Sequence, residues 1–179
     1  MSEQDIIKSE ERWGIVAASA VGIMLAVFVV TSIMMAIRPP SHVETIDPTT
    51  LSTNSEFVAS NLGTQVNPDG SVTVRVIATQ FEFVPRCIPV PVGRPVTFRV
   101  TSPDVIHGFI VAGTNANTMV VPGYVSQVRT VFNSPGDHLM PCHEYCGLGH
   151  SEMWALVKVL DDAHWKPDSL GKMSCEVSR

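Results

Sequence analysis

The sequence predicts a mainly β domain, an antiparallel sandwich or barrel, preceded by one transmembrane α-helix. Three observations predict it: a long uncharged apolar run near the N-terminus, short alternating runs separated by Pro and Gly, and a dense group of soft metal ligands between two of those runs. A chain of 179 residues has room for about one ordinary domain and an appendage. A large multidomain enzyme is therefore excluded.

The composition places part of the chain in lipid. Hydrophobic residues make up 45% of the chain and charged residues only 16%, which is too apolar for a disordered or wholly soluble protein of average composition. The net charge is −5, and there is no long basic block of the kind that binds nucleic acid. We therefore expect a lipid bilayer, and no nucleic acid, among the partners.

The apolar run over 13–37 contains no Asp, Glu, Lys or Arg, and about 20 of its residues are enough to cross a hydrocarbon core of about 30 Å. A cleaved signal peptide is the alternative, but its apolar region is usually shorter, and no small-residue cleavage site is evident. Lys8 and Arg12 precede the run, whereas Arg38 alone soon follows it. The positive-inside rule then predicts that residues 1–12 lie in the cytoplasm and residues 38–179 outside, as a single-pass protein of the cell membrane.

Residues 38–69 read as a linker, because they contain several prolines and a polar run over 49–55 with little periodicity. A short helix could form over 55–62. A turn signal at 67–70 then introduces the β domain, which we place at 70–162. Its expected strands are 72–78, 96–100, 106–111, 127–132 and 154–160. Residues 163–179 carry no recognisable motif and are expected to form a surface tail.

The chemistry is concentrated in one loop between two expected strands. Cys142, Cys146, His150 and Met153 place four soft or borderline metal ligands within twelve residues. A lone His or Met is usually a packing residue, but the combination with two cysteines at fixed spacing favours a metal site. A loop surrounds a metal from one side only, so a distant ligand is needed. His107, on an apolar strand, is the best candidate.

Three metal sites are compatible with these ligands. Zinc would take Cys142, Cys146, His107 and His150 in a closed structural site without Met153. A mononuclear blue copper would leave one cysteine unexplained, and the protein would then be a free-standing electron carrier. Two coppers bridged by both thiolates, each ion bound by one histidine, use every ligand. That arrangement has no open coordination position and indicates an electron relay rather than a substrate-converting site.

A family resemblance rests on the same residues. The segment Ser102-Pro103-Asp104-Val105-Ile106-His107, followed by Cys142-x-Glu144-x-Cys146-Gly147-Leu148-Gly149-His150-x-x-Met153, resembles subunit II of heme-copper cytochrome c oxidases, which carries the binuclear CuA centre. The single N-terminal helix is most similar to the compact B-type branch. The resemblance implies a cupredoxin-like β-barrel on the periplasmic or outer face. The ligands it implies are His107, Cys142, the Glu144 backbone carbonyl, Cys146, His150 and Met153.

The resemblance also implies partners and a direction of electron flow. A soluble cytochrome c or cupredoxin would donate electrons, which pass to heme in subunit I, where O2 is reduced to water. Phe81 or Phe83 would lie where electrons enter, with core packing as the competing interpretation. The Glu144 side chain could reach a Mg or Mn ion at the subunit I interface. Glu10 or Glu11, just before the membrane helix, could serve in proton uptake, with ordinary surface charge as the alternative.

Two cysteines lie outside the ligand loop. Cys87 and Cys175 have no ligand partners nearby in the sequence, and nothing in the sequence sets their separation. A disulfide is an alternative in an oxidising compartment, but free thiols are the default expectation.

Overall fold

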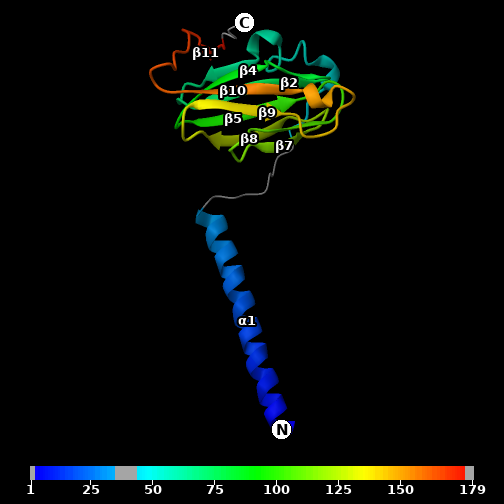
Figure 1. Cartoon of the computed structure of the whole chain (residues 1–179), viewed down its shortest axis with the longest axis vertical. Coiled ribbons are helices and arrows are strands. Elements are labelled where there is room, and N and C mark those ends of the chain that lie inside the picture. Colours follow the sequence, from blue (N-terminus) through cyan, green and yellow to red (C-terminus); the bar gives the residue numbers. More distant parts are fainter. Residues whose placement is uncertain (1–2, 35–43, 176–179) are drawn as a thin grey trace. The chain divides into compact units, whose positions relative to one another are not determined.

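The computed structural model describes residues 3–34 and 44–175, which belong to two compact units (Figure 1). The first unit is Met1–His42 and the second is Val43–Arg179. The N-terminal unit contains the helix, and the second unit contains all the described strands.

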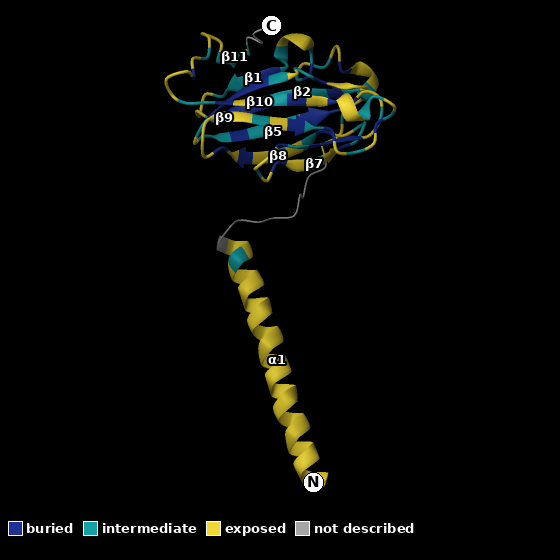
Figure 2. Cartoon of the chain, viewed as in Figure 1, coloured by how far each residue is buried: buried dark blue, intermediate teal, exposed yellow. Residues whose placement is uncertain are grey.

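Helix α1 (Glu3–Met34) has 32 residues, and its apolar part has a mean hydropathy of 2.4. Its side chains are almost all exposed within the chain, as expected of a helix that faces lipid or another protein (Figure 2). The helix begins before the expected span, because the charged residues 3–12 continue it, and Glu3 and Asp5 favour its N-terminal turn. Residues 35–37 of the expected span lie outside the described residues.

The second unit is built from short strands and three 3₁₀ helices within residues 44–175. The strands are β1 (Gly63–Val66), β2 (Val72–Thr79), β3 (Glu82–Val84), β4 (Cys87–Pro91), β5 (Pro95–Thr101), β6 (His107–Ile110), β7 (Asn117–Val120), β8 (Ser126–Val131), β9 (Gly136–Pro141), β10 (Trp154–Leu160) and β11 (Lys172–Met173). The 3₁₀ helices are η1 (Pro48–Thr50), η2 (Ala59–Asn61) and η3 (His150–Glu152). The strand predicted over 154–160 coincides with β10, and the other four predicted strands match β2, β5, β6 and β8 within two residues. The helix considered over 55–62 reduces to η2.

The strands form a sandwich. One sheet has the order β11-β1-β2-β5-β8, with β3 also paired to β2, and the other has the order β4-β10-β9. A separate ribbon pairs β6 with β7. The mainly β fold is confirmed, but the pairing is not purely antiparallel: β2 pairs with β5 and β10 with β4 in parallel. Each parallel pair needs a crossover connection, which local turn signals do not reveal.

The core lies between the two larger sheets. Val74, Val76 and Phe98 are fully buried on one sheet, and Ala155 and Val157 are fully buried on the other (Figure 2). Inward residues alternate with more exposed ones along β5 and β10. This alternation buries one face of each sheet and fixes the strand register.

The expected linker over 38–69 is wrong for its described part, residues 44–69. Leu51 and Phe57 are buried, and β1 pairs with β2. Glu44 and Glu56 both accept hydrogen bonds from the Arg99 guanidinium on β5. These long-range contacts give an otherwise aperiodic polar segment a fixed place on the sheet, and sequence patterning could not reveal them.

The expected free thiols and surface tail are also corrected. Cys87 and Cys175 form a disulfide with a Cα–Cα distance of 5.7 Å. Strand β11 pairs with β1, and Trp165 is buried in the domain core. The described part of the tail, residues 163–175, therefore packs back on the domain. The pairing joins residues 88 positions apart, which no local spacing could predict.

Candidate metal centre

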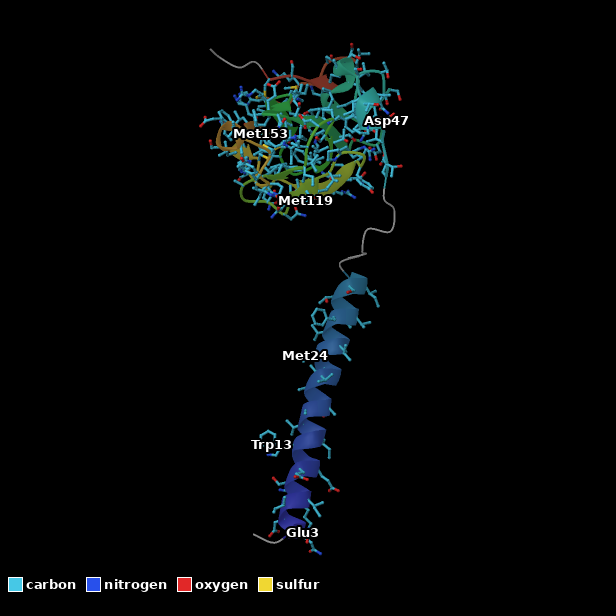
Figure 3. The ribbon with its side chains drawn as sticks, turned by 90° about the vertical axis from the view of Figure 1, so that its right-hand side faces the viewer. Glu3, Trp13, Met24, Asp47, Met119 and Met153 are labelled. Carbon is cyan, nitrogen blue, oxygen red and sulfur yellow. A yellow bond between two sulfur atoms is a disulfide. The ribbon has the colours of Figure 1, made fainter. Side chains whose placement is uncertain are left out.

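The predicted ligand loop connects β9 to β10 and is closed by backbone hydrogen bonds. The amide of Cys142 donates to the carbonyl of Met153, at 2.9 Å, so the two ends of the loop lie side by side. Cys142 also forms an isolated bridge with Phe109 on β6, the strand that begins at His107. Met153 lies within the strand domain (Figure 3). The fold thus brings the distant histidine to the loop.

The side-chain donors converge on the two cysteine sulfurs. Cys142 and Cys146 are buried and not joined by a disulfide, and their Sγ atoms are 3.9 Å apart. His107 Nδ1 lies 4.0 Å from Cys142 Sγ, and His150 Nδ1 lies 3.6 Å from Cys146 Sγ. Met153 Sδ lies 3.6 Å from Cys146 Sγ. Metal-binding atoms of His107, Cys142 and Cys146 all fall within 4.8 Å of one another.

The backbone carbonyl of Glu144 also lies beside the sulfur pair. Its carbonyl oxygen lies 3.2 Å from Cys142 Sγ, so an oxygen donor also faces the sulfur pair. The residue as a whole is half-buried. All six residues predicted as ligands therefore lie close together. The sequence could predict this cluster because five of the six lie in one loop.

The ring of His107 is held by a residue that the sequence reasoning did not single out as functional. His107 is fully buried, and its Nε2 lies 2.9 Å from Asp104 Oδ1. A carboxylate beside Nε2 accepts a hydrogen bond from the N–H there, which favours the tautomer with its proton on Nε2 and leaves Nδ1 free to bind a metal. The Asp-x-x-His spacing within the quoted motif was the available signal.

The electrostatics of the pocket favour a bound cation. Burial raises the pKa of the Cys146 thiol to about 11, and the adjacent Cys142 contributes in the same direction. Partial burial by itself raises the pKa of Asp104, but hydrogen bonds from His107, Gln80, Val105 and Thr79 outweigh it and hold that pKa well below its usual range. Two adjacent buried thiolates would repel each other, and a bound cation would stabilise both.

The remaining predicted residues lie in three different settings. Phe81 is 37% exposed, and Phe83 is fully buried in the core. An added Cβ at Gly147 or Gly149 would come within 3 Å of the Phe81 ring, so the ring lies against the ligand loop. Glu10 and Glu11 are exposed on α1, in the other compact unit.

The donor set fits a metal that prefers sulfur and imidazole. Two thiolates, two imidazole nitrogens, a thioether and a carbonyl suit copper or zinc and do not suit magnesium or calcium, which prefer oxygen ligands. The thioether so close to a cysteine sulfur favours copper, because zinc sites of this type are complete without methionine. The residues present therefore fit a copper centre.

The fold and the site together define a class of protein: a β domain with a candidate copper site suited to electron transfer, preceded in the chain by the apolar helix α1. Comparison with known proteins agrees with this class. Residues 65–160 match the family profile described as cytochrome c oxidase subunit II, periplasmic domain. The chain is 38% identical over 137 residues to a cytochrome c oxidase subunit 2 of Thermus thermophilus, covering 76% of this chain and 82% of the relative. A second Thermus thermophilus subunit 2 sequence is 41% identical over 121 residues, covering 68% and 90%.

The structural comparison gives the same result. A solved heme-copper terminal oxidase dimer contains a chain that is similar with a TM-score of 0.62 and 28% identity, covering 84% of this chain and 99% of that one. The chain belongs to the cytochrome c oxidase subunit II family. It is an electron-transfer subunit of an oxidase complex, with a periplasmic-type, cupredoxin-like domain and an N-terminal helix that is long and apolar enough to span a membrane.

Proposed function

We propose that the chain binds a binuclear CuA centre through His107, Cys142, the Glu144 carbonyl, Cys146, His150 and Met153. The observation that carries the proposal is the pair of buried, unbridged sulfurs of Cys142 and Cys146, 3.9 Å apart, with an imidazole Nδ1 beside each. When bound, a copper pair supplies a one-electron site whose charge change is shared over both ions and both sulfurs. The protein contributes a buried pocket and fixed ligands, which keep the geometry constant when the oxidation state changes.

The direction of electron flow follows from this assignment and from the family. A soluble cytochrome c or a cupredoxin would donate electrons to copper held by these residues, and the copper would supply the one-electron site from which heme in subunit I is reduced and O2 is converted to water. Exposed apolar side chains on the ligand loop itself, Tyr145 and Leu148, with exposed fractions of 70% and 97%, support docking of a donor beside the pocket. Phe81 packs against the same loop and is partly exposed, so it is a better candidate for electron entry than the buried Phe83.

The membrane arrangement is part of the proposal. Helix α1 crosses the cell membrane once, with residues 1–12 in the cytoplasm and the copper domain on the periplasmic or outer face. Its one candidate span within the described residues supports assignment to the compact B-type branch. Subunit I is the partner within the membrane, and Glu10 or Glu11 serves proton uptake at the cytoplasmic end. The half-buried Glu144 side chain is available for a Mg or Mn ion at the subunit I interface.

The test is a copper count with an electron paramagnetic resonance spectrum of the detergent-extracted full chain loaded with copper. Two coppers per chain and the seven-line hyperfine pattern of an electron shared by two spin-3/2 nuclei are expected. One copper with a four-line pattern would instead indicate a mononuclear carrier. Tight zinc binding without stable copper would indicate a structural site, and either result would overturn the proposal. Extraction with a heme-bearing multispan partner is expected, and recovery as a heme-free monomer would count against subunit I as partner.

A further inference from the structure

The turn between β2 and β3, taken together with the last residue of β2 as residues 79–81, contacts both segments that carry the proposed ligands. Thr79, Gln80 and Phe81 are not among the proposed ligands. Each contacts the His107 segment or the ligand loop: Thr79 and Gln80 bond to Asp104, Gln80 also bonds to Cys146, and Phe81 packs against two loop glycines. The turn therefore lies where the segment around His107 and the loop around Cys146 come together.

The first contact of the turn is with the Asp104 carboxylate. The Thr79 hydroxyl and the Gln80 amide both donate to Asp104 Oδ2, each at 2.8 Å. The other carboxylate oxygen, Oδ1, holds His107 Nε2. One carboxylate thus joins the turn to the ring of a metal ligand.

The second contact is with the ligand loop. The Gln80 side chain donates through Nε2 to the backbone carbonyl of Cys146, 66 residues away. Beside it, the Phe81 ring packs against Gly147 and Gly149 so closely that neither position has room for a Cβ. The hydrogen bond from Gln80 and the packing of the Phe81 ring therefore restrict the ligand loop at Cys146 and in the residues that directly follow it.

We propose that Gln80 is a positioning residue for the metal centre: its backbone amide fixes the Asp104–His107 pair while its side-chain amide fixes the Cys146 peptide. One residue then sets the separation between the two halves of the ligand set, because both bonds start from the same short turn. The expected effect on copper binding rests on the proposed function. The hydrogen bond between Gln80 and Cys146, however, is present in the chain without metal. Outer hydrogen bonds of this kind typically change metal affinity 10–100-fold when removed.

The experiment uses Gln80→Glu, which keeps the shape and the backbone bond but replaces the side-chain donor by an acceptor that repels the Cys146 carbonyl. Gln80→Met, which removes the donor without adding charge, serves if the first variant does not fold. Gln127→Glu is the matched control, since Gln127 accepts a hydrogen bond from Arg99 on the sheet instead. All are made in the full chain in detergent.

Two readouts separate this inference from the proposed function. In the metal-free chain, amide hydrogen exchange of His150 and Glu152, whose N–H groups bond to Gly147 and Gly149, should become about fivefold faster or more in the Gln80 variants and stay unchanged in the control. In the copper-loaded chain, transfer of copper to a chelator should become about tenfold faster, and the hyperfine pattern should change.

The outcomes are distinct. Unchanged exchange in the Gln80 variants would overturn the positioning role, whether or not copper binds as a pair. Faster exchange together with altered copper release and spectrum supports it. Faster exchange in a chain that never forms a copper pair would support the loop contact but overturn the proposed CuA function.

Discussion

Asp104 Oδ1 lies 2.9 Å from His107 Nε2, and the opposite nitrogen of the same ring faces Cys142 Sγ at 4.0 Å. The carboxylate and the sulfur thus lie beside the two different nitrogens of one fully buried imidazole ring. The ring cannot rotate without losing one contact, so its metal-binding nitrogen is fixed before a metal arrives.

Replacing Asp104 by Asn should weaken copper binding about 10–100-fold, because the amide no longer favours the proton on Nε2. A competition titration with a copper chelator measures the effect. Asp161→Asn is a close control, since Asp161 also pairs with a histidine three residues later, His164, at 2.6 Å but on the exposed surface. Equal copper affinity in both variants would contradict the orienting role of Asp104.

Met153→Leu should keep two coppers but change the hyperfine pattern and the reduction potential, because a weak outer ligand tunes the centre without holding it. The swap nearly conserves volume and should cost less than about 1.5 kcal/mol of stability. Met140→Leu supplies the control, since Met140 is equally buried in the core on β9. If the two variants gave identical spectra, Met153 would not be a ligand.

Gly149→Ala should destabilise the loop by about 1–3 kcal/mol through overpacking and speed copper loss, because the new Cβ would lie 2.6 Å from Phe81 Cγ. The backbone φ of Gly149 is −91°, which alanine adopts without strain, so the effect is purely one of space. Adding Phe81→Ala should then recover copper retention towards that of Phe81→Ala alone. A double variant as poor as the sum of the single ones would argue against direct contact.

The clustering of the six candidate ligands could be predicted because five of them follow each other in one loop with metal-site spacing. His107 was predictable as an additional ligand, but its partner Asp104 only becomes functional through the close approach seen in the fold. The contact between Gln80 and Cys146 joins residues 66 positions apart and has no sequence signal of its own.

Strands with strong alternation, such as β2 and β10, were predicted well because burial of one face imposes a two-residue period. The structure of the segment over 44–69 and of the tail was not predicted, because individual long-range bonds hold these parts in place. Arg99 with Glu56 and Cys87 with Cys175 are such bonds, and neither leaves a periodic pattern.

The carboxylate of Glu56 gives a prediction for acid stability. Burial alone raises its pKa, but hydrogen bonds and charge from Arg99, and then Arg75, outweigh it and lower the pKa in the folded chain. A carboxylate with a depressed folded pKa stabilises the protein above its unfolded pKa of about 4.3, and the contribution is lost as pH falls through the folded value.

Glu56→Gln should therefore lower the free energy of unfolding by about 1–2 kcal/mol at pH 7 and reduce the loss of stability below about pH 4. Urea unfolding at several pH values measures both. Asp162→Asn, which removes the exposed ion pair with Arg94, is the control and should change stability by less than about 0.5 kcal/mol. A Glu56→Gln profile parallel to that of the unsubstituted chain would show that this pair does not contribute to acid sensitivity.

The disulfide between Cys87 and Cys175 closes a long loop and attaches the C-terminal segment to the strand β4, which pairs in parallel with β10. Cys175→Ser should lower the stability of the domain by about 2–4 kcal/mol, because the unfolded chain regains the freedom that the cross-link removes. Ser174→Ala, one position away, is the control and should be nearly neutral. Since Cys142 and Cys146 are not in a disulfide, a mild reductant should bring the unsubstituted metal-free chain to the stability of Cys175→Ser and leave that variant unchanged. If reductant changed neither protein, the cross-link would be absent in solution, and the packing of Trp165 and β11 would by itself have to hold the tail on the domain.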